Sequence, residues 1–193
     1  FKLQLRTPEY IDASAQWQAF AKRNFLKPGI KKKDPTLLRV YLDTRIQYAR
    51  AIWTDHRPSE AKKILLETEK QLARRIPVHE SMLIRARIAE EAGDFNEMAS
   101  ILYQVPIDSL PDRATKARFL WYKGWNLRRL PMASSTREAI LALEQATQFE
   151  DRHSDQTRNM YWTAKLYGQI GETEKSRQLF TDLVDFSPFG FYG

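Results

Sequence analysis

Few side chains of this chain have the types and spacings that do chemistry. The three histidines, His56, His79 and His153, fall near expected helix ends, and no two share a spacing that would place two metal ligands together. The chain contains no cysteine, which removes thiolate metal ligands, cysteine nucleophiles and disulfides. No glycine-rich phosphate-binding motif and no serine-hydrolase motif occurs. The sequence therefore predicts no catalytic residue, no metal site and no cofactor.

Paired carboxylates are the other chemical candidates. Glu90–Glu91 and Glu172–Glu174 are expected at solvated helix ends or turns, whereas a glycosidase needs an acid in an apolar pocket. Glu80–Ser81 falls at the start of an expected helix, where a negative charge is favourable. We interpret Glu80 as a residue that stabilises a helix start and not as a catalytic acid.

Basic residues favour an acidic partner. Lysine and arginine number 31 against 24 acidic residues, which gives a formal charge of +7. Nucleic acid, anionic lipid and a polyanion such as peptidoglycan all fit this charge. Nucleic acid is disfavoured because the chain lacks both the interleaved aromatic and basic motif of single-strand binders and a helix-turn-helix signature. No apolar run approaches the roughly 20 residues of a membrane span, so we expect none.

The five tryptophans lie on expected helices. Most are expected to pack in the core or between repeats, because large aromatic side chains bury the most apolar surface. Trp121 or Trp125 could alternatively form a platform on which a sugar or a base stacks.

A repeat organises the chain. Small residues recur at intervals of 37, 38 and 40 residues, at Ala49, Ala86, Gly124 and Ala164. In the last unit, residues 160–188, the order is Ala164, Tyr167, a turn at Gly171, Ser176, Phe180 and Pro188. Small residues let two antiparallel helices approach, and glycine permits the tight turn between them. This order resembles a tetratricopeptide (TPR) repeat. In the third unit, which contains Gly124, the turn between the helices is about three residues longer.

The expected fold class is all-α, an α-solenoid or superhelix of about four irregular TPR-like helix pairs plus an N-terminal helix. Residues 1–36 would hold that helix and a basic loop with Lys31–Lys33, and residues 37–193 the repeats. The last repeat would cover residues 158–188.

First helices usually line the concave face of such a solenoid. The residue after each small position should face that groove, and Arg128 and Arg129 lie one turn beyond Trp125. The predicted groove or ligand-binding residues are Arg50, Arg87, Trp125, Arg128 and Lys165.

Two segments, residues 117–146 and 158–193, carry a more specific resemblance. They contain an aromatic-rich helix with Gly124-Trp125, an alanine-rich helix, a Tyr161-Trp162 pair and a closing Phe191-Tyr192-Gly193. This order resembles the last repeats of the superhelical domain of periplasmic soluble lytic transglycosylases, which cleave peptidoglycan glycan strands.

The resemblance implies that residues 189–193 form a hand-over segment to a lysozyme-like catalytic domain beginning past Gly193. Phe189, Phe191 and Tyr192 would then form the domain interface. That domain carries a Glu-Ser dipeptide followed by Gly-Leu-Met-Gln, and no such stretch follows Glu80–Ser81 here.

Two functions are expected from the sequence. The first is a non-catalytic helical domain in a bacterial envelope or periplasm that holds or guides peptidoglycan beside a separate catalytic domain. The alternative is a TPR-type scaffold that binds a protein or peptide partner in its concave groove.

Overall fold

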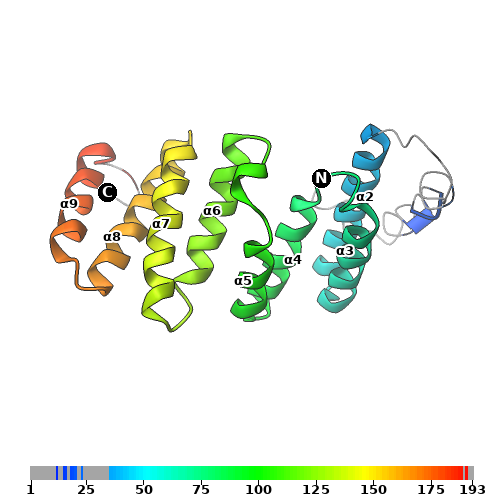
Figure 1. Cartoon of the computed structure of the whole chain (residues 1–193), viewed down its shortest axis with the longest axis horizontal. Helices are drawn as coiled ribbons and strands as arrows, with labels where there is room; N and C mark the ends of the chain where they lie inside the picture. Colours follow the sequence, from blue (N-terminus) through cyan, green and yellow to red (C-terminus); the bar gives the residue numbers. More distant parts are fainter. Residues whose placement is uncertain are drawn as a thin grey trace. The chain divides into compact units, whose positions relative to one another are not determined.

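The computed structural model describes residues 12, 15, 16, 18–20, 23, 35–188 and 190. Every regular element among them is helical, which confirms the expected all-α class. The α-helices and one 3₁₀ helix, in chain order (Figure 1), are α2 (Pro35–Thr54), α3 (Pro58–Leu72), α4 (His79–Glu91), α5 (Phe95–Tyr103), η2 (Ile107–Ser109), α6 (Arg113–Leu127), α7 (Ala133–Phe149), α8 (His153–Gln169) and α9 (Thr173–Phe186). None of these described helices has the length and apolar composition that crossing a bilayer requires.

The chain divides into two compact units, which we call the N-terminal unit (residues 1–92) and the C-terminal unit (residues 93–193). The boundary falls at the turn between α4 and α5. The division expected at residue 36, between an N-terminal segment and the repeats, stays a prediction, because residues 24–34 lie outside the described residues.

Helices α2, α3 and α4 of the N-terminal unit pack on one another around an apolar core. Small residues of the three helices are fully buried: Ala49 on α2, Ala61 on α3 and Ala86 on α4 are each 0% exposed. Larger side chains such as Leu65 and Ile84 fill the space beside them. In this unit, therefore, small residues are buried between the helices and large residues fill the core beside them, as the repeat pattern predicts.

A buried ion pair joins α3 to α4 in the same unit. Arg85 donates from Nη2 to Oε2 of Glu69 at 2.8 Å and from Nε to Oε1 at 3.3 Å. Ser81, which is 0% exposed, donates its hydroxyl to Oε1 of Glu69 at 3.0 Å. Glu80 lies in the first turn of α4, as expected for an acidic residue at a helix start. Ser81 thus contributes to a buried polar network.

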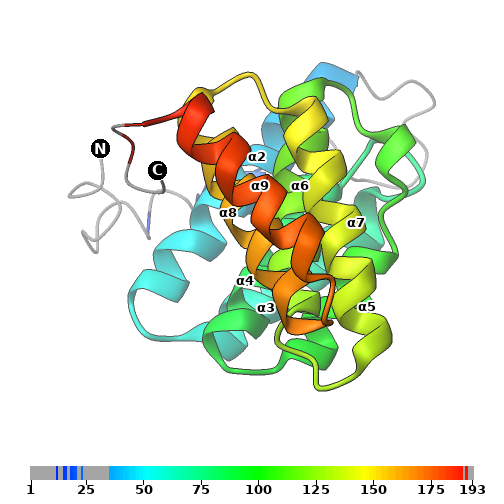
Figure 2. The same ribbon diagram turned by 90° about the vertical axis from the view of Figure 1, so that its left-hand side faces the viewer.

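The C-terminal unit brings α6 against α7, α7 against α8 and α8 against α9 (Figures 1 and 2). Gly124 explains how closely α6 approaches α7. A Cβ at this position would lie 2.7 Å from Cγ of Leu143 and 3.1 Å from the backbone oxygen of Ala139. The backbone φ of Gly124 is not positive, so its conformation does not require a glycine. The close packing of α6 on α7 does.

The turns inside three helix pairs share a left-handed residue. Gly93 and Gly171 have φ of 76° and 82°, and His56 has φ of 59°. Each stands seven residues after its small position, at Ala86, Ala164 and Ala49 respectively. The third pair, α6 and α7, has the longer connection that its sequence predicts. Histidine at residue 56 adopts a conformation that glycine tolerates better.

Several sequence predictions fall on residues outside the described set: Phe189, Phe191, Tyr192, Lys31–Lys33 and most of the expected N-terminal helix. Residues 12, 15, 16, 18–20 and 23 of that helix are described, and they are helical. Helix α9 ends at Phe186, two residues before Pro188. The Phe186 ring lies 4.3 Å from that of His153 at the start of α8, so it contacts the first helix of its pair.

Candidate functional site

The predicted groove residues divide between the two units. Arg50 and Arg87 are half-buried in the N-terminal unit, where the Arg87 guanidinium carbon lies 5.6 Å from the centre of the Trp53 ring. Trp125 on α6, Arg128 at the C-cap of α6 and Lys165 on α8 belong to the C-terminal unit, and the structure brings these three together around Trp162.

Three tryptophans of α6 and α8 form the centre of this site. Trp121 and Trp125 stack with ring centres 5.2 Å apart and planes 27° apart. Trp162 meets Trp125 edge to face, with ring centres 5.2 Å apart and planes 82° apart. Both are favoured geometries for aromatic pairs. All three rings are half-buried, so each keeps part of its surface open to solvent.

Guanidinium groups cover these rings. The Arg128 guanidinium carbon lies 3.6 Å from the centre of Trp125 and 4.3 Å from that of Trp162, so its group contacts two indoles. The Arg158 guanidinium carbon lies 3.7 Å from the centre of Trp121. Cation–π contacts hold a planar guanidinium by its face and leave the N–H groups at its edge able to bind an anion. We call Trp121, Trp125, Trp162, Arg128 and Arg158 the aromatic–arginine cluster.

Two more cations flank the aromatic–arginine cluster. Arg129 lies 4.9 Å from the centres of both Trp125 and Phe95. The Lys165 amine lies 5.3 Å from the centre of Trp162 and 5.6 Å from that of Tyr161. The cluster and its surroundings thus form a positively charged surface on aromatic support.

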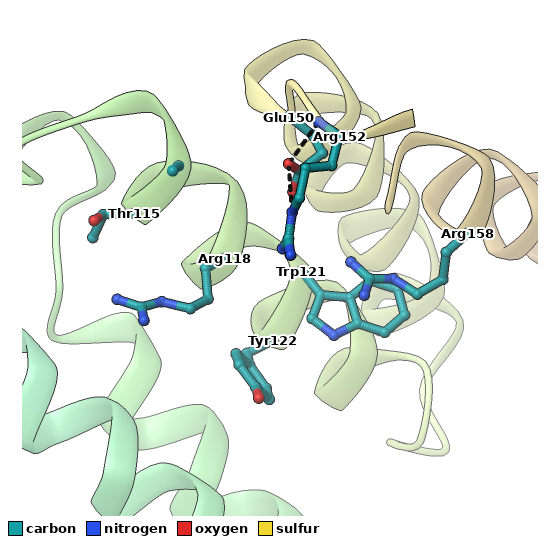
Figure 3. A pocket seen from close by; sticks show the side chains of 8 residues that line it. Thr115, Arg118, Trp121, Tyr122, Glu150, Arg152 and Arg158 are labelled. Atoms are coloured by element: carbon teal, nitrogen blue, oxygen red, sulfur yellow. Dashed lines mark hydrogen bonds and ion pairs between the residues drawn. The ribbon is translucent and has the colours of Figure 1, made fainter. Parts of the chain in front are cut away.

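A pocket of about 390 Å³ opens beside the aromatic–arginine cluster (Figure 3). We call it the arginine pocket, and its lining residues are Ala114, Thr115, Arg118, Trp121, Tyr122, Glu150, Arg152 and Arg158. Figure 3 shows Arg152 and Arg158 beside Trp121, with Arg118 across the pocket from them. The pocket therefore has cationic groups on two sides.

Carboxylates position the arginines of this pocket. Asp155 forms ion pairs with Arg152 and, at 2.8 Å, with Arg158. Glu150 pairs with Arg152 at 3.6 Å, and its Oε1 also accepts the backbone N–H of Arg152 at 3.1 Å. These acids fix the guanidinium groups of two arginines and partly balance their charge.

Asp112 lies at the start of α6, next to the pocket. The Thr115 N–H and then the Thr115 hydroxyl donate to its carboxylate, and the nearby Arg118 adds a favourable charge. Together these lower the pKa of Asp112 below its ordinary value. Asp112 is therefore an ionised N-cap that stabilises the first turn of α6, one turn before Arg118.

Among the described residues, no three His, Asp or Glu side chains are arranged to hold a metal ion. His56 occupies a turn, while His79 and His153 begin α4 and α8. The expectation that the histidines lie near helix ends is confirmed for these residues.

The sequence prediction missed Arg118, Arg152, Arg158 and Trp162. The repeat register contained a signal for two of them. Arg118 and Arg158 both stand six residues before their small positions, Gly124 and Ala164. Arg152 lies in the connection before α8 and has no counterpart in the register, so only the structure places it at the pocket.

Structural comparison finds TPR-like proteins. The chain is similar to BtubC (BKLC) from P. vanneervenii, with a TM-score of 0.64 and 13% identity over 94% of this chain and 74% of that one. It is also similar to MamA from Desulfovibrio magneticus RS-1 (TM-score 0.60, 10% identity, coverage 93% and 96%). A third similar structure is the TPR-like repeat region of a putative kinesin light chain from Podosopora anserina (TM-score 0.54, 15% identity, coverage 95% of each chain). No protein-family model and no curated protein matches the chain.

These comparisons define the class of the fold. The chain is an all-helical, TPR-like repeat protein, as the sequence predicts. At identities of 10–15% the likeness concerns the fold alone. The function must therefore be argued from the aromatic–arginine cluster and the arginine pocket.

Proposed function

We propose that this chain is a partner-binding module that holds an acidic peptide segment of another protein on the aromatic–arginine cluster. The observation that carries the proposal is the contact of Arg128 with two indole rings, at 3.6 and 4.3 Å. A guanidinium held in this way has lost side-chain freedom before the ligand arrives, which reduces the entropy lost on binding. Carboxylates are the natural ligands of its edge N–H groups.

The position of the cluster supports the same proposal. Its tryptophans and Arg158 lie on α6 and α8, and Arg128 caps the C-terminal end of α6. These are the first helices of two successive pairs, and first helices commonly face the peptide groove of helical repeats. Trp125, Arg128 and Lys165 were selected from the sequence by this register. Arg50 and Arg87 of the N-terminal unit remain predicted contributors.

The resemblance to lytic transglycosylases gives a second hypothesis, with a place in the bacterial envelope. It rests on the sequence motifs alone and finds no support among the structures compared. The faces of Trp121 and Trp125 are covered by guanidinium groups, which disfavours a sugar-stacking platform. Purified peptidoglycan is therefore tested as the alternative ligand alongside the peptides.

The test measures binding of fluorescently labelled peptides by anisotropy. A Glu-rich peptide should bind at least about tenfold tighter than its Gln-rich counterpart, because a charge-assisted hydrogen bond contributes about 1.5–3 kcal/mol. Arg128→Met should remove most of this preference. Arg177→Met is the matched control, since Arg177 on α9 is 70% exposed and lies outside the cluster.

Two results would contradict the proposal. One is equal affinity for the acidic and neutral peptides. The other is cosedimentation with purified peptidoglycan that Arg128→Met abolishes while no peptide binds. The double variant Arg50→Glu plus Arg87→Glu then tests whether the N-terminal unit contributes to whichever ligand binds.

A further inference from the structure

The arginine pocket has features that the aromatic–arginine cluster alone does not explain. Three of its eight lining residues are arginines, and they come from α6, from the α7–α8 connection and from α8. Guanidinium groups supplied by separate elements can surround a compact anion, whereas a single helix face can only line one side of it. The volume of about 390 Å³ is within the usual range for a small bound group.

We propose that the arginine pocket binds the phosphate group of a phosphorylated side chain in the partner peptide. This inference rests on the proposed function, and it specifies the ligand of that site. A phosphate monoester carries about −1.5 to −2 charges at neutral pH and offers three acceptor oxygens. Arginine clusters are a recurring means of recognising such groups.

The acids around the pocket favour phosphate over a carboxylate. Asp155 and Glu150 already supply carboxylates to Arg152 and Arg158. Another carboxylate would only compete with groups of the same kind and charge. A phosphate has more charge and more oxygens, so it can engage the remaining N–H groups while Asp155 stays in place.

Arg158 provides an independent indication. Its Nη1 contacts Asp155 and its Nη2 lies 3.3 Å from Oδ1 of Asn159. Its Nε is buried and has no hydrogen-bond partner among the described residues. Buried donors in proteins nearly always have an acceptor. A phosphate oxygen at the pocket is an acceptor of the kind that this guanidinium lacks.

Arg118 and Arg152 allow a test at exposed side chains of the pocket, and thermal unfolding of each variant checks that it is folded. Both side chains are exposed, and the Arg152 side chain is 77% exposed. The probes are the Glu-rich peptide and the same peptide with one central phosphoserine or phosphotyrosine. We expect one of the phosphorylated forms to bind at least about tenfold tighter than the unphosphorylated form, which is about 1.4 kcal/mol. Arg118→Gln and Arg152→Gln should each reduce that gain and together abolish it.

The control variants separate this inference from the proposed function. Arg118→Gln plus Arg152→Gln should leave the affinity for the unphosphorylated peptide within about twofold, because these arginines lie outside the aromatic–arginine cluster. Arg177→Gln should change neither affinity. Equal binding of phosphorylated and unphosphorylated peptides, or a phosphate-dependent gain that survives in the double variant, overturns the phosphate site and leaves the proposed function standing. Absence of binding by every peptide overturns both.

Discussion

Replacing Arg85 with methionine is expected to lower the free energy of unfolding of the N-terminal unit by about 3–5 kcal/mol. The change removes the hydrogen bonds at 2.8 and 3.3 Å that Arg85 donates to Glu69. Both side chains are 11% exposed, so solvent cannot replace the lost partner. Among the described residues, Glu69 would keep only the Ser81 hydroxyl as a donor, and one hydroxyl does not compensate a buried carboxylate charge.

The magnitude can be separated into its causes by a double-mutant cycle. Glu69→Met alone should also be strongly destabilising, because it leaves the Arg85 guanidinium buried without its carboxylate. The double variant Glu69→Met plus Arg85→Met removes both charges, and its loss should be far smaller than the sum of the two single losses. The measurement is urea unfolding followed by far-ultraviolet circular dichroism, with linear extrapolation to water.

An exposed pair in the same unit provides the control. Arg57 contacts Glu60 with side chains 46% and 42% exposed, so Arg57→Met should change stability far less than Arg85→Met does. The reasoning fails if Arg85→Met is no more destabilising than Arg57→Met. It also fails if the losses from Glu69→Met and Arg85→Met simply add.

Three further predictions concern turns, packing and pH. Gly171→Ala should lower stability by about 1–2 kcal/mol, because its φ of 82° is strained for alanine although no atom lies within 4 Å of the added Cβ. Gly124→Ala should lower it by about 1–3 kcal/mol through the clash with Leu143; thermal unfolding measures both, and an unchanged midpoint would contradict either one. Burial first, then the hydrogen bond to Glu144, raises the pKa of Tyr167 to about 12. Burial first, then the hydrogen bond to Glu138, likewise raises the pKa of Tyr103 to about 12. The contribution of these tyrosines to the free energy of unfolding is therefore fully present below pH 10 and is lost as the pH rises toward 12. Ultraviolet titration should show that two tyrosines ionise above the ordinary tyrosine range, and only one should do so in Tyr167→Phe.

The repeat could be predicted from the sequence because it depends on the sizes of residues at regularly spaced positions. Ala49, Ala86 and Ala164 are fully buried, and a Cβ at Gly124 would clash with Leu143 of α7. This requirement is local and recurs at every pair, so one chain displays it several times. The same pattern predicted the turn at Gly171, where the backbone φ is 82°.

The site could be predicted only in part. Trp125 and Lys165 were selected by the register, because position on a first helix decides which way a side chain points, and Arg128 was selected because it lies one turn beyond Trp125. The arginine pocket does not follow from it. Arg152 belongs to a connection, and its place depends on ion pairs with Glu150 and Asp155 that no periodicity encodes. The division of the chain at residue 92 likewise depends on how contacts are distributed in space.

The grouping of three of the chain's five tryptophans has an optical consequence. Trp121, Trp125 and Trp162 form a continuous contact series with 5.2 Å between successive ring centres. At such separations excitation is shared among the indoles, and neighbouring guanidinium charges shift their transition energies. The chain therefore carries an intrinsic chromophore at the surface proposed to bind the partner. Occupation of that surface should change its near-ultraviolet dichroism and its emission without any added label.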